Sequence, residues 1–308
     1  MTPGGVAVAA GRGASTPSWA RRALDDALWG PESGRRLRFL HAALATLIGL
    51  RVVLGPYRAL AEVPPALFEP VPVLGVLDRM PSAGTIVALQ VVGGVAALAA
   101  VLRRRPRLAF ALAWACLLVL AGLRGSRGKV LHNDLLLLWA SAPLLLAPVE
   151  AAWHDRERRR RWGWPVRTSM VLSALVYFFA GYHKVRRAGL DWAVGDNVRY
   201  VMLWGPTIGR ARWESMARWV GENLWASQLT GAYILAVELT FPLAVLWRRS
   251  RGFYVASAVA LHVATWFLLG LDYWAWAATV LVVFVDWPAM GDRLRGRGAM
   301  REAAAVAR

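Results

Sequence analysis

The stretch from Gly84 to Leu102, GTIVALQVVGGVAALAAVL, contains no charged side chain. An α-helix of about twenty apolar residues is long enough to cross the hydrocarbon core of a bilayer. The basic turn Arg103-Arg104-Arg105-Pro106-Arg107 follows at once. An apolar run closed by a basic cluster is typical of a transmembrane helix that ends at the cytoplasmic face.

This alternation of apolar runs and short basic clusters continues along the chain. Of its 308 residues 57% are hydrophobic, and the mean hydropathy of +0.40 is too high for an ordinary soluble domain. Because a bilayer core cannot hydrogen-bond exposed backbone, apolar runs of this kind predict helices. We expect an all-α integral membrane protein, a polytopic bundle of about eight transmembrane helices, at residues 39–60, 84–102, 108–123, 130–149, 166–184, 228–247, 252–271 and 273–287.

The remaining sequence divides into two tails and one long connection. Residues 1–36, rich in Gly, Ala, Pro and Arg, are expected to form a disordered cytoplasmic tail, and residues 288–308 a basic cytoplasmic tail. The transmembrane domain then covers residues 37–287. Within it, residues 185–225 are polar and rich in Trp, and amphipathic helices are expected around residues 213–224.

The net charge of +18 and the pI of about 11.4 would suggest nucleic acid as the partner of a soluble protein. Here the basic residues lie in the tails and after the second, fourth and sixth predicted helices. This is the positive-inside pattern, with residues 124–129 as an exception. It predicts a multi-pass protein of the cell membrane with both termini cytoplasmic. The lipid bilayer, and not nucleic acid, is its expected partner.

Seven tryptophans lie near the predicted helix ends. Tryptophan favours the membrane–water interface, so we expect these side chains to be interfacial anchors. They are Trp153, Trp162, Trp164, Trp192, Trp225, Trp247 and Trp287.

Titratable and strongly polar groups inside the predicted helices are costly in a bilayer, and each is therefore a candidate site residue. With the topology above, several of them fall in the outer half of the bundle. We expect Lys184, His262 and either His132 or Asp134 to line one polar cavity. No HxxxH or HExxH pattern occurs, so no metal is expected. The candidates are Arg51, His132, Asn133, Asp134, His183, Lys184, Glu238 and His262.

Simpler interpretations of these residues stay open. Lys184 can extend its ammonium group to the lipid head groups, and Asp134 can pair with Arg51 or Arg124 for stability alone. His262 can be a packing residue of an apolar helix, and Glu238 can bond a neighbouring helix. The single cysteine, Cys116, excludes an intrachain disulfide or a dithiol reaction.

One segment, Tyr177-Phe-Phe-Ala-Gly-Tyr-His-Lys184 followed by Asp191-Trp192-Ala-Val-Gly195, resembles a family signature. It is similar to the "YF-AG-x-x-K … W-x-x-G" signature of the horizontally transferred transmembrane (HTTM) domain. That domain is the membrane portion of vitamin K-dependent γ-carboxylases and their bacterial relatives. The resemblance covers roughly residues 39–287 and includes Leu50-Arg51-Val52, His132-Asn133-Asp134, Glu238-Leu-Thr-Phe-Pro242 and His262.

The resemblance implies a quinone or hydroquinone cofactor of the vitamin K or menaquinone type, with Lys184 as the base that deprotonates it. An apolar cavity disfavours the charged form of a lysine and so makes its neutral amine available. Tyr177, Gly181 and Lys184 share one helix face, and Gly181 lets a helix or a flat ring approach that face closely. The expected catalytic residues are Lys184, His183, His132 and His262, and the expected cofactor-binding residues are Arg51, Asn133, Asp134, Tyr177 and Glu238.

The chain departs from the carboxylase in two respects. His183-Lys184 stands where the carboxylase has two adjacent lysines, and the long lumenal region that holds the carboxylase's protein substrate has no counterpart after the eighth helix. Carboxylation of a peptide is therefore not expected. Two hypotheses stay open: a carboxylase-like or quinone-linked membrane enzyme, and a non-catalytic membrane protein. The latter would be a DoxX-like subunit with a redox protein as its partner, or a small transporter.

Overall fold

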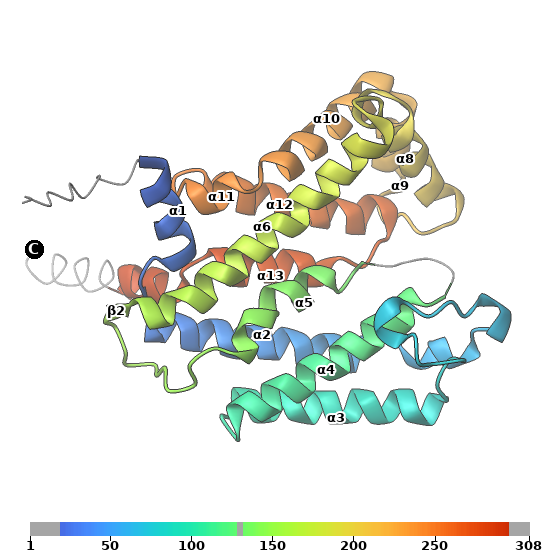
Figure 1. Ribbon diagram of the computed structural model, residues 1–308. Coiled ribbons are helices and arrows are strands. Elements are labelled where there is room, and N and C mark those ends of the chain that lie inside the picture. Colours follow the sequence, from blue (N-terminus) through green and yellow to red (C-terminus); the bar gives the residue numbers. More distant parts are fainter. Residues whose placement is uncertain (1–18, 128–131, 296–308) are drawn as a thin grey trace, which may run out of the picture.

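The computed structural model describes residues 19–127 and 132–295, and this part of the chain is almost wholly helical (Figure 1). Short 3₁₀ turns follow α2 and α5, and a helix over Trp287–Arg295 follows α13. The labelled elements are α1 (Trp19–Trp29), β1 (Glu32–Ser33), α2 (Gly34–Leu54), α3 (Ala83–Val101), α4 (Pro106–Gly125), α5 (Leu135–Ser141), β2 (Arg158–Arg159), α6 (Arg160–Ala188), α7 (Asp191–Val194), α8 (Asn197–Thr207), α9 (Glu214–Glu222), α10 (Leu224–Thr240), α11 (Leu243–Leu246), α12 (Arg251–Leu269) and α13 (Trp274–Phe284).

Four helices in the described part of the chain are long and apolar enough to cross a membrane, namely α2, α3, α4 and α12. The count rises to five if α13 and Trp287–Arg295, which meet at 66°, form one bent segment. These helices agree with a helical membrane protein, whereas the predicted number of eight is not reached by length and composition alone. α10 has only 17 residues, and the 29-residue α6 carries arginines at both ends.

The boundaries differ from the predicted ones where local chemistry overrides hydropathy. The first long helix ends at Leu54 and not at residue 60, because Gly55-Pro56 follows and a proline disfavours helical backbone in the residue before it. Expected disorder over residues 1–36 is wrong from Trp19 on, where α1 forms and buries Ala27. Residues 1–18, 128–131 and 296–308, with the predicted start of the fourth helix, lie outside the described residues.

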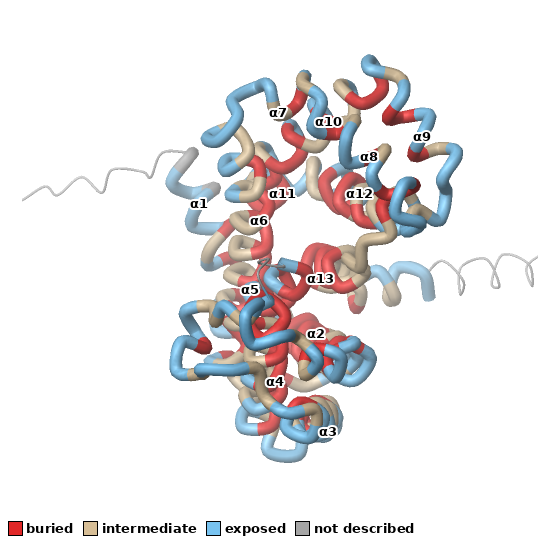
Figure 2. The backbone as a smooth tube through the Cα atoms, turned by 90° about the vertical axis from the view of Figure 1, so that its right-hand side faces the viewer, coloured by how far each residue is buried: buried red, intermediate tan, exposed pale blue. Residues whose placement is uncertain are grey.

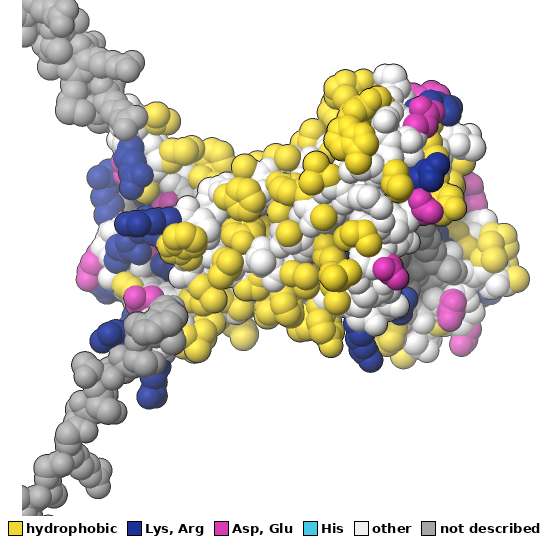
Figure 3. Space-filling model, turned by 90° about the horizontal axis from the view of Figure 1, so that it is seen from above, with side chains coloured by type: hydrophobic (Ala, Val, Ile, Leu, Met, Phe, Trp, Pro, Cys, Tyr) yellow, Lys and Arg dark blue, Asp and Glu magenta, His cyan; other side chains and the backbone are white. Residues whose placement is uncertain are grey.

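The basic turns gather at one end of the molecule. The two described chain ends, the α3–α4 turn, the β1–β2 bridge and the turn before α12 all lie there (Figure 1). Figure 3 shows Lys and Arg side chains concentrated at this end, next to a broad hydrophobic band. This separation of charge from apolar surface is what the positive-inside pattern leads one to expect.

The main core lies between α2, α4, α5, α6 and α13, whose facing sides are buried (Figure 2). Leu44, Phe110, Leu117, Tyr177 and Phe284 are among its buried side chains. A second, smaller core joins α8 and α9 to the end of α12. α3 lies at the edge against α2 and α4, and its outer face exposes Val91, Val95 and Leu98. A lipid-facing helix is expected to expose such a face.

Candidate functional site

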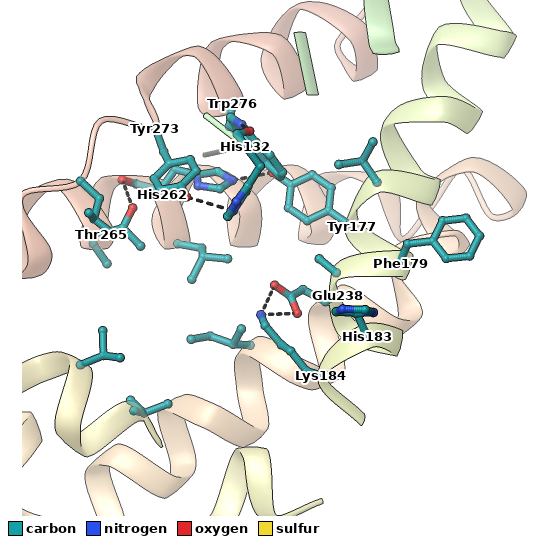
Figure 4. A pocket seen from close by; sticks show the side chains of 18 of the residues that line it. His132, Tyr177, Phe179, His183, Lys184, Glu238, His262, Thr265, Tyr273 and Trp276 are labelled. Atoms are coloured by element: carbon teal, nitrogen blue, oxygen red, sulfur yellow. Dashed lines mark hydrogen bonds and ion pairs between the residues drawn. The ribbon is translucent and has the colours of Figure 1, made fainter. Parts of the chain in front are cut away.

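A cavity of about 1170 Å³ lies between α6, α8, α10, α12 and the start of α13. Its walls are mostly aliphatic and aromatic, and its polar groups come from distant parts of the sequence. His132, Lys184, Glu238 and His262 all line it. The structure thus brings together the residues that the sequence places at similar depth in different helices. Figure 4 shows their side chains.

The most polar feature of the cavity is an ion pair between α6 and α10. Lys184 donates from Nζ to both carboxylate oxygens of Glu238, at 2.5 and 2.6 Å. The lysine side chain is 25% exposed and the glutamate 8%. The ammonium group also lies 4.3 Å from the ring centroid of Trp192. Lys184 therefore contacts a carboxylate and an aromatic face. A lysine that only extends to the lipid head groups would need neither contact.

Gly181 explains why these two helices meet here. A Cβ atom at this position would lie 2.9 Å from Cβ of Glu238 and 3.1 Å from the backbone nitrogen of Leu239. A glycine therefore allows α10 to approach α6 at one turn from Lys184. Of the two partners that the sequence left open for Gly181, a helix and a flat ring, the structure places the helix against it.

A second polar pair lies deeper among aromatic side chains. The hydroxyl of Tyr177 is 2.7 Å from Nε2 of His262, and the tyrosine ring stacks on Phe241 with centroids 4.2 Å apart. Both Tyr177 and His262 are buried. Nδ1 of His262 is buried without a hydrogen-bond partner among the described residues. A buried, unpaired ring nitrogen can accept or donate a bond to a bound ligand.

His132 reaches the cavity from the segment before α5. Its Nε2 lies 3.0 Å from the hydroxyl of Tyr273, and its backbone oxygen accepts a bond from the Trp276 indole. Tyr273 in turn stacks on His262, with centroids 5.7 Å apart. The two histidines are therefore linked through one tyrosine ring.

His183 lies on the rim of the cavity and is exposed. It shares α6 with Lys184 but makes no hydrogen bond to the Lys184–Glu238 pair in the described part of the chain, so it lies at the edge of the site. Phe179, in the same segment, points away from the Lys184–Glu238 pair (Figure 4).

The expectation that Arg51, Asn133 and Asp134 bind a cofactor in this cavity is not met by their positions. None of the three lines it. Arg51 instead bonds Asp134 through Nε and Asp272 through Nη1, the latter at 2.6 Å. The Asn133 amide donates to the backbone oxygen of Asp272 at 2.7 Å.

This ion network joins the ends of four helical segments, α2, α4, α5 and α13. Asp134 also accepts a bond from the Tyr57 hydroxyl at 3.3 Å and lies 3.6 Å from the Arg124 guanidinium. Both Arg51 and Asp134 are buried. Charges of opposite sign that are buried together satisfy each other, which agrees with the stabilising interpretation of Asp134.

Several residues of the cavity and of the Arg51 network were not predicted from the sequence. Tyr273 and Trp276 appear in the sequence only as aromatic residues at the start of an apolar run, and Asp272 only as a loop acid. Trp192, expected as an interfacial anchor, lies beneath Lys184, and Trp162 is buried in the core. The shared position of Asp272, Tyr273 and Trp276 at the start of α13 is the signal that could have indicated them.

Comparison of the chain with protein-family models, curated proteins and solved structures finds no match.

Proposed function

We propose that the chain is a polytopic protein of the cell membrane with eight crossing segments and both termini in the cytoplasm. The segments are α2, α3, α4, α5 with its 3₁₀ extension, α6, α10 with α11, α12 and α13. Residues 168–183 of α6 carry no Asp, Glu, Lys or Arg, and the single acidic residue of α10 is paired with Lys184. Both segments are thereby compatible with a bilayer, although α10 is short and α6 is basic at both ends.

We further propose that the protein is an HTTM-type membrane enzyme that binds a lipophilic quinol, of the menaquinone or vitamin K type, in the cavity. The observation that carries this proposal is the Lys184–Glu238 pair on the wall of a large, mostly apolar cavity. Ligand cavities of this kind typically combine apolar walls with a few convergent polar groups. The positions of Tyr177 and His262 beside the pair add support.

The cavity fits such a ligand in both size and chemistry. Its volume of about 1170 Å³ is slightly above the usual range of about 300–1,000 Å³ for small-molecule sites, as a ligand with an isoprenoid chain requires. Apolar side chains suit an isoprenoid chain, while the unpaired Nδ1 of His262 offers a polar group to a ring oxygen. A bound quinol would supply an acidic hydroxyl group and two reducing electrons.

The Lys184–Glu238 pair can hold and move one proton. As an ammonium–carboxylate pair it has no free base on the lysine. Transfer of the proton from Nζ to a carboxylate oxygen neutralises both groups, and an apolar wall favours neutral forms. Lys184 is then an amine that can accept a proton from a ligand hydroxyl, with Glu238 as the store of the first proton.

Tyr177 and His262 orient each other next to this pair. The tyrosine ring is held by Phe241, so its hydroxyl keeps a fixed direction towards Nε2 of His262. Side chains that packing holds in one orientation position a ligand more precisely than exposed side chains do. We therefore assign them to ligand orientation.

The experiment that tests this proposal is extraction of quinones from the purified protein. Ile234 lines the cavity one helical turn from Glu238, so Ile234→Trp fills it. Val95→Trp adds the same ring to the exposed face of α3 and serves as the control. We expect menaquinone in the wild type and Val95→Trp, and a strong loss in Ile234→Trp. No quinone in the wild type, or equal amounts in both variants, would refute the proposal.

A second candidate function is a non-catalytic membrane subunit or a small transporter. The bidentate contact of Lys184 with Glu238 favours it, because a bridge between two helices needs no chemistry. The two candidate functions predict different effects of Lys184→Arg: a loss of activity for the enzyme and no functional loss for the non-catalytic protein.

A further inference from the structure

A group of arginines, none of which lines the cavity, gathers at the end of the molecule that holds the two described chain ends. Arg36 of α2, Arg158 of β2 and Arg167 of α6 surround Glu32. Arg248 and Arg251, from the turn before α12 and its first residue, interact electrostatically with the same group. We call these five residues the inner arginine cluster, and Figure 3 shows basic side chains at this end.

Glu32 is the centre of the cluster. It is 2% exposed, and its Oε1 lies 2.8 Å from Nη1 of Arg36 and 2.7 Å from Nη2 of Arg167. Its other oxygen is 3.5 Å from Arg158. The two-residue β1–β2 bridge, which pairs Glu32 with Arg159, fixes the position of the glutamate. One carboxylate therefore forms ion pairs with three guanidinium groups.

The cluster carries more positive than negative charge. Among the described residues, Asp286 is the second acid within ion-pair distance of the cluster, 3.9 Å from Arg36. Five arginines against these two carboxylates leave an excess of three positive charges. No carboxylate of the described residues lies within ion-pair distance of Arg248 or Arg251.

Two of the arginines also have hydrogen-bond donors to spare. Arg251 donates from Nε to the backbone oxygen of Ala244 at 3.1 Å, and it is only partly exposed. Nε of Arg167 is buried without a partner in the described part of the chain. The strongest electrostatic neighbours of Arg251 are Arg36, Arg167 and Arg248, opposed by Glu32. A partly buried arginine among like charges is destabilised unless an anion approaches.

We propose that the inner arginine cluster binds a phosphate group at Arg248, Arg251 and Arg167. Guanidinium groups recognise phosphate through paired, charge-assisted hydrogen bonds. Basic pockets between helices on the cytoplasmic side of a membrane bind anionic head groups, so an anionic phospholipid of the inner leaflet is the expected source. The proposal rests on the membrane placement proposed above and is independent of any chemistry in the cavity.

Binding to the full-length, delipidated protein in a neutral detergent tests this site. Native mass spectrometry measures the affinity for phosphatidylglycerol and for phosphatidylcholine, and a thermal-shift assay measures stabilisation by inorganic phosphate. Arg251→Gln removes one phosphate contact while keeping a donor for Ala244. Arg249→Gln removes the same charge from the turn before α12, at an exposed position that makes no ion pair with the described residues of the cluster.

We expect phosphatidylglycerol to bind more tightly than phosphatidylcholine, and Arg251→Gln to weaken it by about tenfold, since one charge-assisted bond is lost. Arg249→Gln should leave the affinity for phosphatidylglycerol within about twofold, because the interaction between a distant, exposed charge and the bound phosphate is weak. Arg248→Gln, on an exposed side chain, repeats the test if Arg251→Gln does not fold.

The remaining outcomes also decide the question. Stabilisation by inorganic phosphate that depends on Arg251, without preference for the anionic lipid, keeps the phosphate site and makes a soluble phosphate its ligand. Equal affinity for both lipids without any effect of phosphate, or equal losses in Arg251→Gln and Arg249→Gln, overturns the proposal.

Discussion

Nζ of Lys184 lies 2.5 Å from Oε1 and 2.6 Å from Oε2 of Glu238, so that one ammonium group joins α6 to α10 at the wall of the cavity. The bond is compatible with two roles, a bridge and a proton store. A bridge needs only a positive charge, whereas a proton store needs a group that can lose its proton. A substitution that keeps the positive charge but cannot lose a proton therefore distinguishes the two roles.

Lys184→Arg keeps the positive charge and can bond Glu238 through two nitrogens, but an arginine does not give up its proton. We expect the variant to fold normally and to retain bound quinone. The aerobic oxidation of added menadiol, followed by its absorbance, should fall by at least about a hundredfold, the usual contribution of a general base.

Arg187→Lys, a conservative change on an exposed side chain of the same helix, is the control and should leave the rate unchanged. Full menadiol oxidation by Lys184→Arg would show that Lys184 is not a base. The bridge of a non-catalytic subunit would then be its whole role.

Gly181→Ala should separate α6 from α10. Its new Cβ would stand 2.9 Å from Cβ of Glu238 and 3.1 Å from a backbone nitrogen that cannot move alone. We expect a loss of about 1–3 kcal/mol in the free energy of unfolding, the usual cost of overpacking. Unfolding in detergent, followed by circular dichroism, measures it.

Gly252→Ala is the matched control for this substitution. Gly252 also lies in a helix, and a Cβ there would meet nothing within 4 Å. Alanine favours a helix over glycine by up to about 1 kcal/mol, so this variant should be as stable as the wild type or more stable. Equal stability losses at the two glycines would contradict the close approach at Gly181.

Asp134→Asn should destabilise the helix ends that meet at Arg51. It removes the charge that Arg51 and Arg124 share, and it leaves the buried guanidinium of Arg51 with Asp272 alone. Breaking one partner of a buried ion pair costs about 3–5 kcal/mol. A denaturant titration measures the change in the free energy of unfolding, and Glu62→Gln, an exposed acid in the 3₁₀ turn after α2, should change it little.

The proposed topology is tested by labelling introduced cysteines in intact cells. Cys116 is buried, and Cys116→Ala provides the background. A membrane-impermeant maleimide should label Ala66→Cys directly and Arg104→Cys only after permeabilisation, since these exposed positions lie on opposite sides in the proposed topology. Labelling of Arg104→Cys in intact cells would invert the assignment.

The sequence predicts the apolar helices well where hydropathy alone decides their ends. The expected ranges 84–102 and 252–271 correspond to α3 at Ala83–Val101 and α12 at Arg251–Leu269. It predicts them less well where a helix leaves the apolar layer. α6 begins at Arg160, six residues before its expected start, because its first turns lie among basic residues that hydropathy excludes.

For the candidate site, the sequence predicts the depth of a residue but not the direction of its side chain. Depth in the bilayer follows from position along each helix, and it brings Lys184, His132 and His262 to one cavity. The direction in which a helix faces does not follow from depth. Asp134, two residues after His132, therefore turns into the network with Arg51, and no motif in the sequence indicates that Asp272 completes it.

The Arg51 network also sets an order on biogenesis. Arg51 belongs to the first long helix, yet its partners Asp134 and Asp272 lie 83 and 221 residues further along the chain. A ribosome that has just delivered α2 to the bilayer leaves this arginine without either carboxylate, a costly state inside lipid. Arg51 gains its second carboxylate only after the segment that precedes α13 has been synthesised, so in the proposed topology the first membrane helix waits for the last one to complete its ion pairs.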